Sequence, residues 1–273
     1  MANVRVFSFG GGVDSHAVIV LQSQGKLPEP YDYYIFANVG ANSENPYTLE
    51  YIERYTKPFC ERFGIKFVEV QKQRGRGNEK HPDTLLENIQ RSEKSIVIPV
   101  RMGHNGAPGH RNCTDDHKIT VVDTEVKRMG YTSAVIGLGI GADEMQRVRS
   151  TEWYTDNAIQ KKREYPLVSL HLTRAMCIKI ITDAGLPEPP KSSCWFCPFH
   201  KRSEWIDMKM NQPELFAQAV EVERIINAKR TAMRRDYAYI HPDCVPLDRA
   251  VADQPRLFPD ETDDNCDSGY CMT

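Results

Sequence analysis

Residues 7–15 read Phe-Ser-Phe-Gly-Gly-Gly-Val-Asp-Ser, a glycine turn between an apolar strand-like segment and an apolar helix-like one. Glycine adopts backbone dihedrals that are closed to other residues and lets a ligand approach the chain closely. The first amides of the following helix are unpaired donors at its positive end, which suits an oligophosphate. A plain strand-to-helix turn rarely needs three successive glycines followed by Asp-Ser. The stretch therefore predicts a phosphate cradle.

The composition is that of an ordinary globular protein. Of the 273 residues, 26% are charged and 40% are hydrophobic, enough for one large domain with a small appendage. Lys and Arg number 35 against 37 Asp and Glu, a net charge of −2, so any binding to nucleic acid must be local. The longest apolar runs are far shorter than a membrane span and the start of the chain shows no signal peptide. We expect a cytoplasmic protein without membrane contact.

Strand-like and helix-like segments alternate along the chain. The predicted strands are 4–9, 32–39, 66–71, 96–101 and 133–140, and the main predicted helices are 15–24, 46–63, 114–129 and 173–184. This order predicts an α/β fold, a doubly wound parallel sheet whose ligands bind beyond the carboxyl ends of its strands. Three prolines within 187–190 indicate a boundary. We expect a nucleotide-binding domain over 1–186 and a smaller, mainly helical region over 187–273, with a helix from 202 to 233 broken at Pro213.

The glycine turn resembles Ser-Gly-Gly-x-Asp-Ser, the signature of the PP-loop ATP pyrophosphatases, and especially their phosphoadenosine phosphosulfate (PAPS) reductase branch. The resemblance implies a Rossmann-like (HUP) fold that binds ATP with Mg²⁺. It assigns phosphate contacts to Gly10, Gly11, Gly12, Val13, Asp14 and Ser15, with Asp14 also catalytic. Gly10 stands where the family has serine, and we expect Ser8 or Ser15 to supply the missing hydroxyl.

Two further strand ends carry polar or glycine-rich loops. Asn38 follows the second predicted strand, and Gly139 lies among alternating glycines before Asp143 and Arg147. A simple helix entry explains either loop equally well. In the PAPS reductase relatives the corresponding elements contact nucleotide or substrate, so the resemblance adds Asn38, Gly139, Asp143 and Arg147 to the predicted nucleotide site.

The cysteines fall into separate groups. Cys60 and Cys177 recur with apolar residues at helical spacing and are predicted to be core. Cys113 lies near Arg111 at a predicted helix start, with Thr114 as N-cap, and both the helix N-terminus and Arg111 favour its thiolate. Cys194 and Cys197 have the two-residue gap of a chelating pair. Such a pair is typical of a zinc half-site, completed by His200 or Cys113, of a redox pair or of iron–sulfur ligands.

The spacing from Cys113 to this pair resembles that of the [4Fe-4S] sulfonucleotide reductases, with Asn112 in place of their first cysteine. The resemblance implies a [4Fe-4S] cluster on Cys113, Cys194 and Cys197, its fourth position open or closed by Cys266 or Cys271 of the tail. Three-cysteine clusters of this kind occur in PP-loop enzymes that thiolate tRNA. Zn²⁺ and no metal are the alternatives. The resemblance also implies that Arg111 and Lys118 contact an anion and that Cys113 and Lys118 are catalytic residues.

Four basic runs, 72–76, 161–163, 200–202 and 224–235, are either solvated surface or a phosphate track for tRNA or DNA. We expect an ATP-dependent sulfur transferase that adenylates a nucleic-acid acceptor and releases pyrophosphate, served by a cysteine desulfurase or a thioredoxin-like donor. Two alternatives remain open. One is a PAPS or APS reductase that forms sulfite with thioredoxin; the other is a nucleotide-binding component of a nucleic-acid modification complex. An oligomer is compatible with all three functions.

Overall fold

A six-stranded sheet in the order β3-β2-β1-β6-β8-β7 forms the centre of the computed structural model, which describes residues 3–91, 97–102 and 106–251. All neighbouring strands are parallel except β7 and β8. The chain runs outward from β1 to β3 and then returns to β6 on the other side of β1, so the switch point lies at the carboxyl ends of β1 and β6. The strands are β1 (Asn3–Phe9), β2 (Tyr33–Asn38), β3 (Phe67–Gln71), β6 (Ser133–Leu138), β7 (Tyr154–Asp156) and β8 (Ile159–Glu164).

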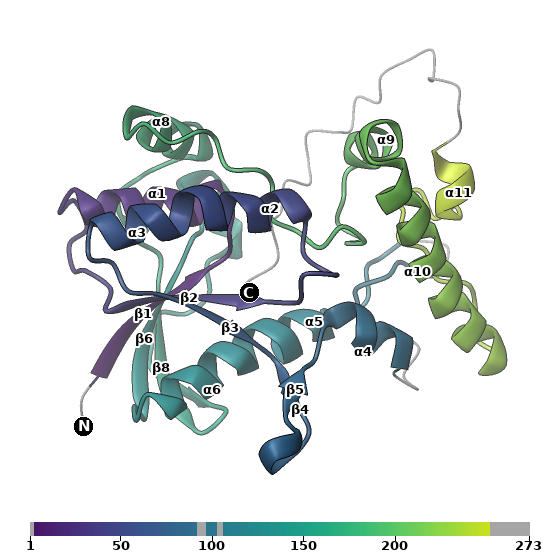
Figure 1. The fold of residues 1–273 in the computed structure, drawn as a ribbon, viewed down its shortest axis with the longest axis horizontal. Helices are drawn as coiled ribbons and strands as arrows, with labels where there is room; N and C mark the ends of the chain where they lie inside the picture. The colour runs from purple at the N-terminus through teal and green to yellow at the C-terminus, as the bar shows by residue number, and fades with distance from the viewer. Residues whose placement is uncertain (1–2, 92–96, 103–105, 252–273) are drawn as a thin grey trace.

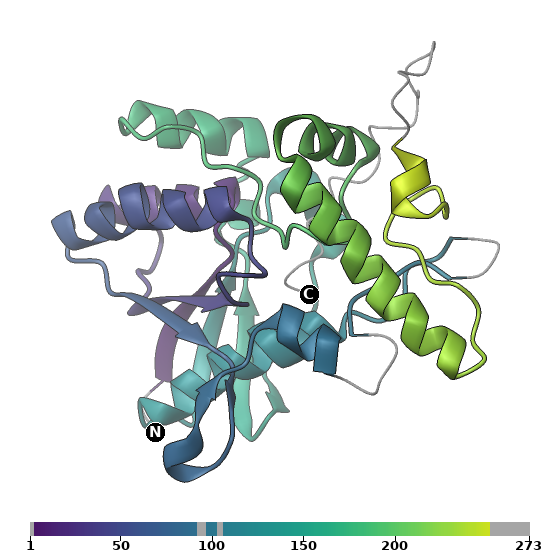
Figure 2. The same ribbon diagram turned by 45° about the vertical axis from the view of Figure 1, so that its right-hand side comes forward.

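Helices cover both faces of the sheet (Figures 1 and 2), which confirms the predicted doubly wound α/β class. Side chains alternate along the strands, because successive residues point to opposite faces. Phe7 and Phe9 pack with α1 (Val13–Ser23) and α8 (Arg174–Asp183), whereas Val4 and Val6 pack against α6 (Thr120–Arg128). The remaining helices of this part are α2 (Pro46–Tyr51), α3 (Lys57–Arg62), α4 (Leu85–Arg91), α5 (Asn112–Thr114) and α7 (Pro166–Ser169).

A second cluster of helices follows the sheet domain along the chain: α9 (Arg202–Asn211), α10 (Pro213–Ala232) and α11 (Leu247–Ala250). The break between α9 and α10 lies at Gln212, directly before the predicted Pro213. Trp205 is fully buried in the core of this cluster, together with Leu85, Ile98 and Val100 from the first half of the chain. The two halves thus share one apolar core, and the boundary near residue 186 stays a prediction.

Three local predictions were wrong. In the segment predicted as a strand over 96–101, the described residues 97–101 join no sheet and form only isolated bridges at Arg101, because their apolar side chains pack beside α10. Strand β8 was missed since its sequence, Ile-Gln-Lys-Lys-Arg-Glu, is mostly charged. The helix predicted to start after Thr114 begins at Asn112 and passes through a π-helical turn, Asp115–Ile119, so Thr114 lies inside a helical segment and caps nothing.

Candidate nucleotide and thiol site

The glycine turn closes tightly around Gly11. This residue has φ +81°, and a Cβ there would lie 2.8 Å from Thr48 Cγ2 and 3.2 Å from Ser192 Oγ. Gly12 is the N-cap of α1, and no side chain forms a capping hydrogen bond at this helix start. The Val13 side chain is buried in the core, so only its backbone can face a ligand. The turn therefore presents an uncapped helix start at the switch point, as an anion site requires.

The carbonyl oxygen of Gly12 is fixed by three donors. It accepts from His16 N (3.2 Å), from Ser15 Oγ (2.9 Å) and from His16 Nδ1 (2.8 Å). His16 Nδ1 must carry the proton since a carbonyl only accepts, and His16 Nε2 then accepts from the Thr56 hydroxyl (2.7 Å). Burial lowers the pKa of His16 to about 4, so the ring is neutral. The peptide between Gly12 and Val13 is consequently held in one orientation.

The two serines predicted to replace the family's hydroxyl lie at the turn and in the strand before it. The Ser15 hydroxyl donates to the Gly12 carbonyl oxygen within the turn, and Ser8 is buried within β1. A third serine, Ser192, donates from its side chain to the carbonyl oxygen of Gly10. The sequence shows Ser192 only as a serine two residues before the Cys-x-x-Cys pair. This position does not predict a contact with a residue 182 positions away.

The Asp14 carboxylate is the one ionisable group of the turn itself. Burial raises its pKa to about 6. Arg174 opposes this shift, the neighbouring acids Glu144 and Asp143 add to it, and Arg147 opposes it more weakly. Its Oδ1 atom is buried and has no hydrogen-bond partner among the described residues. A buried carboxylate oxygen without a partner, beside two arginines, suits a cation-bridged phosphate. Arg174, the first residue of α8, was not predicted from the sequence.

The other predicted nucleotide contacts lie at neighbouring strand ends. Gly139 packs against the turn, since a Cβ there would lie 3.2 Å from Ser15 N. Asn38 is occupied at its own strand end, where it donates to Glu69 Oε1 (2.7 Å) and accepts from the Gly40 amide (2.8 Å). Asp143 accepts from the Arg174 amide (3.2 Å to Oδ2), which holds the start of α8 beside the site.

Arg147 is almost completely buried, with its guanidinium 2.5 Å from Glu144 Oε2. Its positive charge lowers the pKa of Asp14, and the same charge is paired with Glu144. This geometry places a positive group near the turn without exposing it fully to a ligand.

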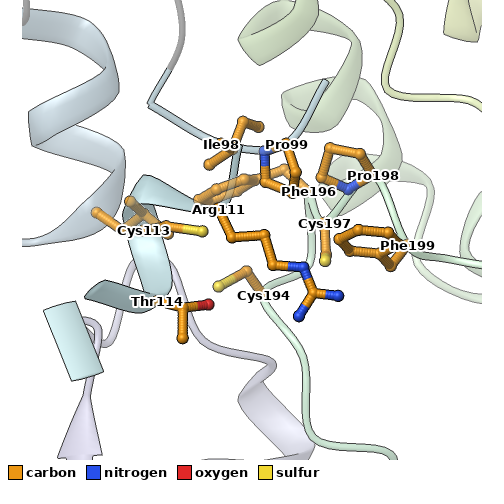
Figure 3. A pocket seen from close by; sticks show the side chains of 11 residues that line it. Ile98, Pro99, Arg111, Cys113, Thr114, Cys194, Phe196, Cys197, Pro198 and Phe199 are labelled. Atoms are coloured by element: carbon orange, nitrogen blue, oxygen red, sulfur yellow. The ribbon is translucent and has the colours of Figure 1, made fainter. Parts of the chain in front are cut away.

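Three cysteines line one pocket, shown in Figure 3. Cys113 comes from α5, whereas Cys194 and Cys197 come from the loop before α9, and their sulfur atoms face the same space. Apolar walls complete the pocket, and the Arg111 guanidinium lies 4.6 Å from the centre of the Phe199 ring. Lys118, predicted as an anion contact, is not among the lining residues.

The three thiols line the same pocket, but they are not arranged as ligands of a single metal ion. Within 3–91, 97–102 and 106–251, no three His, Cys, Asp or Glu side chains are grouped to hold one metal ion. His200, considered as a zinc ligand, is buried with Nε2 bonded to the Cys194 carbonyl (2.9 Å), so it supports the loop instead. Cys266 and Cys271 lie outside the described residues. Cys60 and Cys177 are fully buried in the core, as predicted.

One short segment joins the cradle to the thiol pocket. Ser192 contacts Gly10, Ser193 accepts from the Asn45 amide through its carbonyl (3.2 Å), and Cys194 follows directly. Glu44 and Cys194 form an isolated antiparallel bridge. The loop after β2 thereby fixes the distance between the two halves of the site.

Some cations of the basic runs are used inside the protein, whereas others are exposed. Lys161 is 2% exposed and lies 2.7 Å from Asp123 and 2.9 Å from Asp156, so it serves an internal ion pair and not a phosphate track, whereas Lys162 and Arg163 are half-buried. In 224–235, Lys229 Nζ binds the Gln90 carbonyl (2.9 Å) and Arg230 is buried. In the described part of the chain, no helix combines the length and apolarity that a bilayer crossing requires.

The fold defines a doubly wound α/β protein whose glycine turn lies at the switch point of its sheet. No protein-family model and no curated protein matches the chain. Among solved structures, it is similar to the U34-tRNA thiolase NcsA from Methanococcus maripaludis, determined with its [4Fe-4S] cluster. The sequence identity is 15%, the TM-score is 0.43, and the match covers 83% of this chain and 72% of the thiolase.

Proposed function

We propose that the protein is a PP-loop ATP-dependent sulfur transferase that adenylates a nucleic-acid acceptor, releases pyrophosphate and replaces the activated oxygen with sulfur. One observation carries this proposal: Ser192 contacts the glycine turn, and Cys194, two residues later, lines the three-thiol pocket. Two extended residues span at most about 7 Å. The phosphate cradle and the thiols are therefore close enough to act on one acceptor.

The cradle half would hold the triphosphate of ATP. The amides at the start of α1 bind phosphate oxygens, and the buried Asp14 carboxylate fits Mg²⁺, which prefers oxygen ligands and bridges phosphates. An acceptor oxygen attacks the α-phosphorus, the bond to the bridging oxygen breaks, and pyrophosphate leaves. A sulfide-level sulfur then displaces AMP, so that a carbon–sulfur bond replaces the carbon–oxygen bond.

The thiol half fits an iron–sulfur cluster by the chemistry of its donors. Cys113, Cys194 and Cys197 would hold the cluster, which when bound supplies an iron position that can carry sulfur. Arg111 lies against Phe199 at the pocket, and its positive charge favours the thiolate form that ligation needs. The apolar walls limit the access of water.

Pyrophosphate release tests the nucleotide half. Protein incubated with Mg²⁺, ATP and unmodified RNA is expected to release pyrophosphate, and Asp14→Asn to abolish this release. Absence of pyrophosphate with every acceptor contradicts the proposal. Sulfite formed from PAPS without pyrophosphate assigns the chain to the reductases instead.

Anaerobic reconstitution with iron and sulfide tests the thiol half. Cys113→Ser, Cys194→Ser and Cys197→Ser are each expected to lose bound iron and its visible absorption. Cys244→Ser is the matched control, because Cys244 is a partly exposed thiol outside the pocket. Stoichiometric zinc in place of iron, or equal iron binding by all four variants, contradicts the cluster assignment.

A further inference from the structure

A second, polar pocket lies between a projecting hairpin and α4, toward the end of that helix. The hairpin consists of β4 (Gln73–Arg74) and β5 (His81–Pro82), and both ribbon views show it extending away from the sheet next to α4 (Figures 1 and 2). Residues from both elements line the pocket: Arg74, His81, Glu87, Gln90 and Arg91. All five are exposed.

The pocket carries more positive than negative charge toward solvent. Arg74 is exposed and forms no ion pair with any described residue. Arg91 lies 2.9 Å from Asp83, whose side chain is 4% exposed, and Lys72 lies 3.8 Å from the same carboxylate. One buried acid thus orients two cations without neutralising both. Glu87, the acid of the lining, accepts from the Thr84 amide (3.3 Å) at the start of α4.

The hairpin end is held rigid by a glycine between two arginines. Gly75 has φ +97°, and a Cβ there would lie 2.4 Å from the Glu79 carbonyl oxygen. Only glycine allows this approach. The backbone between Arg74 and Arg76 is therefore preorganised, which lowers the entropy lost when a ligand binds.

Helix α4 sets the distance from this pocket to the thiols. Its first residue, Leu85, lines the thiol pocket, and its last, Arg91, lines the polar one. A helix of seven residues is about 10 Å long at 1.5 Å per residue. Successive phosphates of a stacked strand rise by about 3.4 Å. A phosphate at Arg74 and Arg91 would therefore lie roughly three nucleotides from a base at the thiols.

We infer that this pocket binds a backbone phosphate of a looped RNA acceptor, a few nucleotides from the base that receives sulfur; the inference rests on the proposed function. A base paired in a duplex is not accessible to a pocket walled by protein, whereas RNA loops present unpaired, splayed bases. Positive side chains without base-reading partners suit a phosphate contact that positions the strand.

Binding of a fluorescent RNA stem-loop, measured by anisotropy without ATP between 50 and 200 mM salt, tests the inference. Arg74→Gln is expected to weaken binding roughly fivefold and to lower the log–log salt slope by about 0.7. Gly75→Ala is expected to weaken binding although both neighbouring arginines remain. Lys26→Gln is the matched control, an exposed cation in the turn after α1, and should leave affinity and slope unchanged.

Three outcomes overturn the inference: no RNA binding by the wild-type protein at low salt, unchanged affinity of Arg74→Gln, or an equal loss in Lys26→Gln. A DNA stem-loop of the same sequence that binds equally well overturns the assignment to RNA, and an acidic peptide that competes as strongly assigns the pocket to a protein partner. Pyrophosphate release is scored separately. If Arg74→Gln loses RNA affinity but the wild type releases no pyrophosphate, the proposed function alone is refuted. If the wild type releases pyrophosphate but Arg74→Gln keeps its RNA affinity, the pocket assignment alone is refuted.

Discussion

Gly11→Ala is the sharpest test of the cradle, because the structure separates two costs at this position. The left-handed backbone at φ +81° costs a residue with a Cβ about 1–2 kcal/mol. The new Cβ would also lie 2.8 Å from Thr48 Cγ2, inside a buried contact, and such overpacking costs about 1–3 kcal/mol. We expect a total loss of about 2–5 kcal/mol in the free energy of unfolding.

Denaturant unfolding measures this loss, and titration with ATP and Mg²⁺ measures its effect on the cradle. ATP affinity should fall roughly tenfold or more, since 1.4 kcal/mol of lost phosphate contact corresponds to a factor of ten. Removing the clashing methyl in Gly11→Ala/Thr48→Ser should recover the packing cost and leave the backbone cost. The double variant thus distinguishes the two contributions.

Gly12→Ala is the matched control for this experiment. Gly12 has φ −96° and ψ −179°, which any residue adopts, and a Cβ there would meet only Ser192 Cβ at 3.8 Å. We expect a loss of at most about 1 kcal/mol, from replacing a favourable N-cap residue. An equal loss in Gly11→Ala and Gly12→Ala would refute the reasoning, because the two positions differ only in backbone conformation and available space.

Three further predictions follow from buried charges. Burial raises the pKa of Asp14 to about 6 from 3.8, so its ionised form destabilises the folded state above pH 6 and not below 3.8; Asp14→Asn should raise Tm at pH 7–8, with a gain that shrinks on acidification, while abolishing Mg²⁺-ATP binding. Lys161→Ala should cost about 3–5 kcal/mol in urea unfolding by leaving Asp123 buried and unpaired, against little change for Lys162→Ala. The pKa of Glu204 is lowered to about 2, because interactions with His200 and Lys191 outweigh the opposing effect of burial. Glu204→Gln should therefore destabilise the protein at pH 7. The Tm difference from wild type should vanish as the pH falls from 4.5 toward 2.

The sheet and its switch point could be predicted from local patterns. The apolar residues of β1 and β2 and the glycines after β1 are contained within single segments, and short-range sequence is sufficient to interpret them. Strand β8 could not be found in this way. Its Lys161 is buried and paired with two acids from other elements. Without knowledge of these partners, a charged run is predicted to lie on the surface.

The candidate site was predicted residue by residue for the turn and the cysteines, but not for the contacts that join them. Ser192 and Arg174 are ordinary polar residues in sequence, and only the folded chain brings them to Gly10 and Asp14. The error over 97–101 has the same origin. An apolar run indicates burial, but the sequence does not say whether a sheet or a helix covers it.

The contact between Gly10 and Ser192 also sets an order of events during synthesis. The two residues are 182 positions apart. At about 5–20 residues per second, a ribosome adds Ser192 roughly 10–35 s after the glycine turn. During that interval the turn exists without the serine that closes it. A nascent or prematurely terminated chain should therefore hold ATP weakly, and nucleotide capture becomes a late sign that the thiol-bearing half has been made and docked.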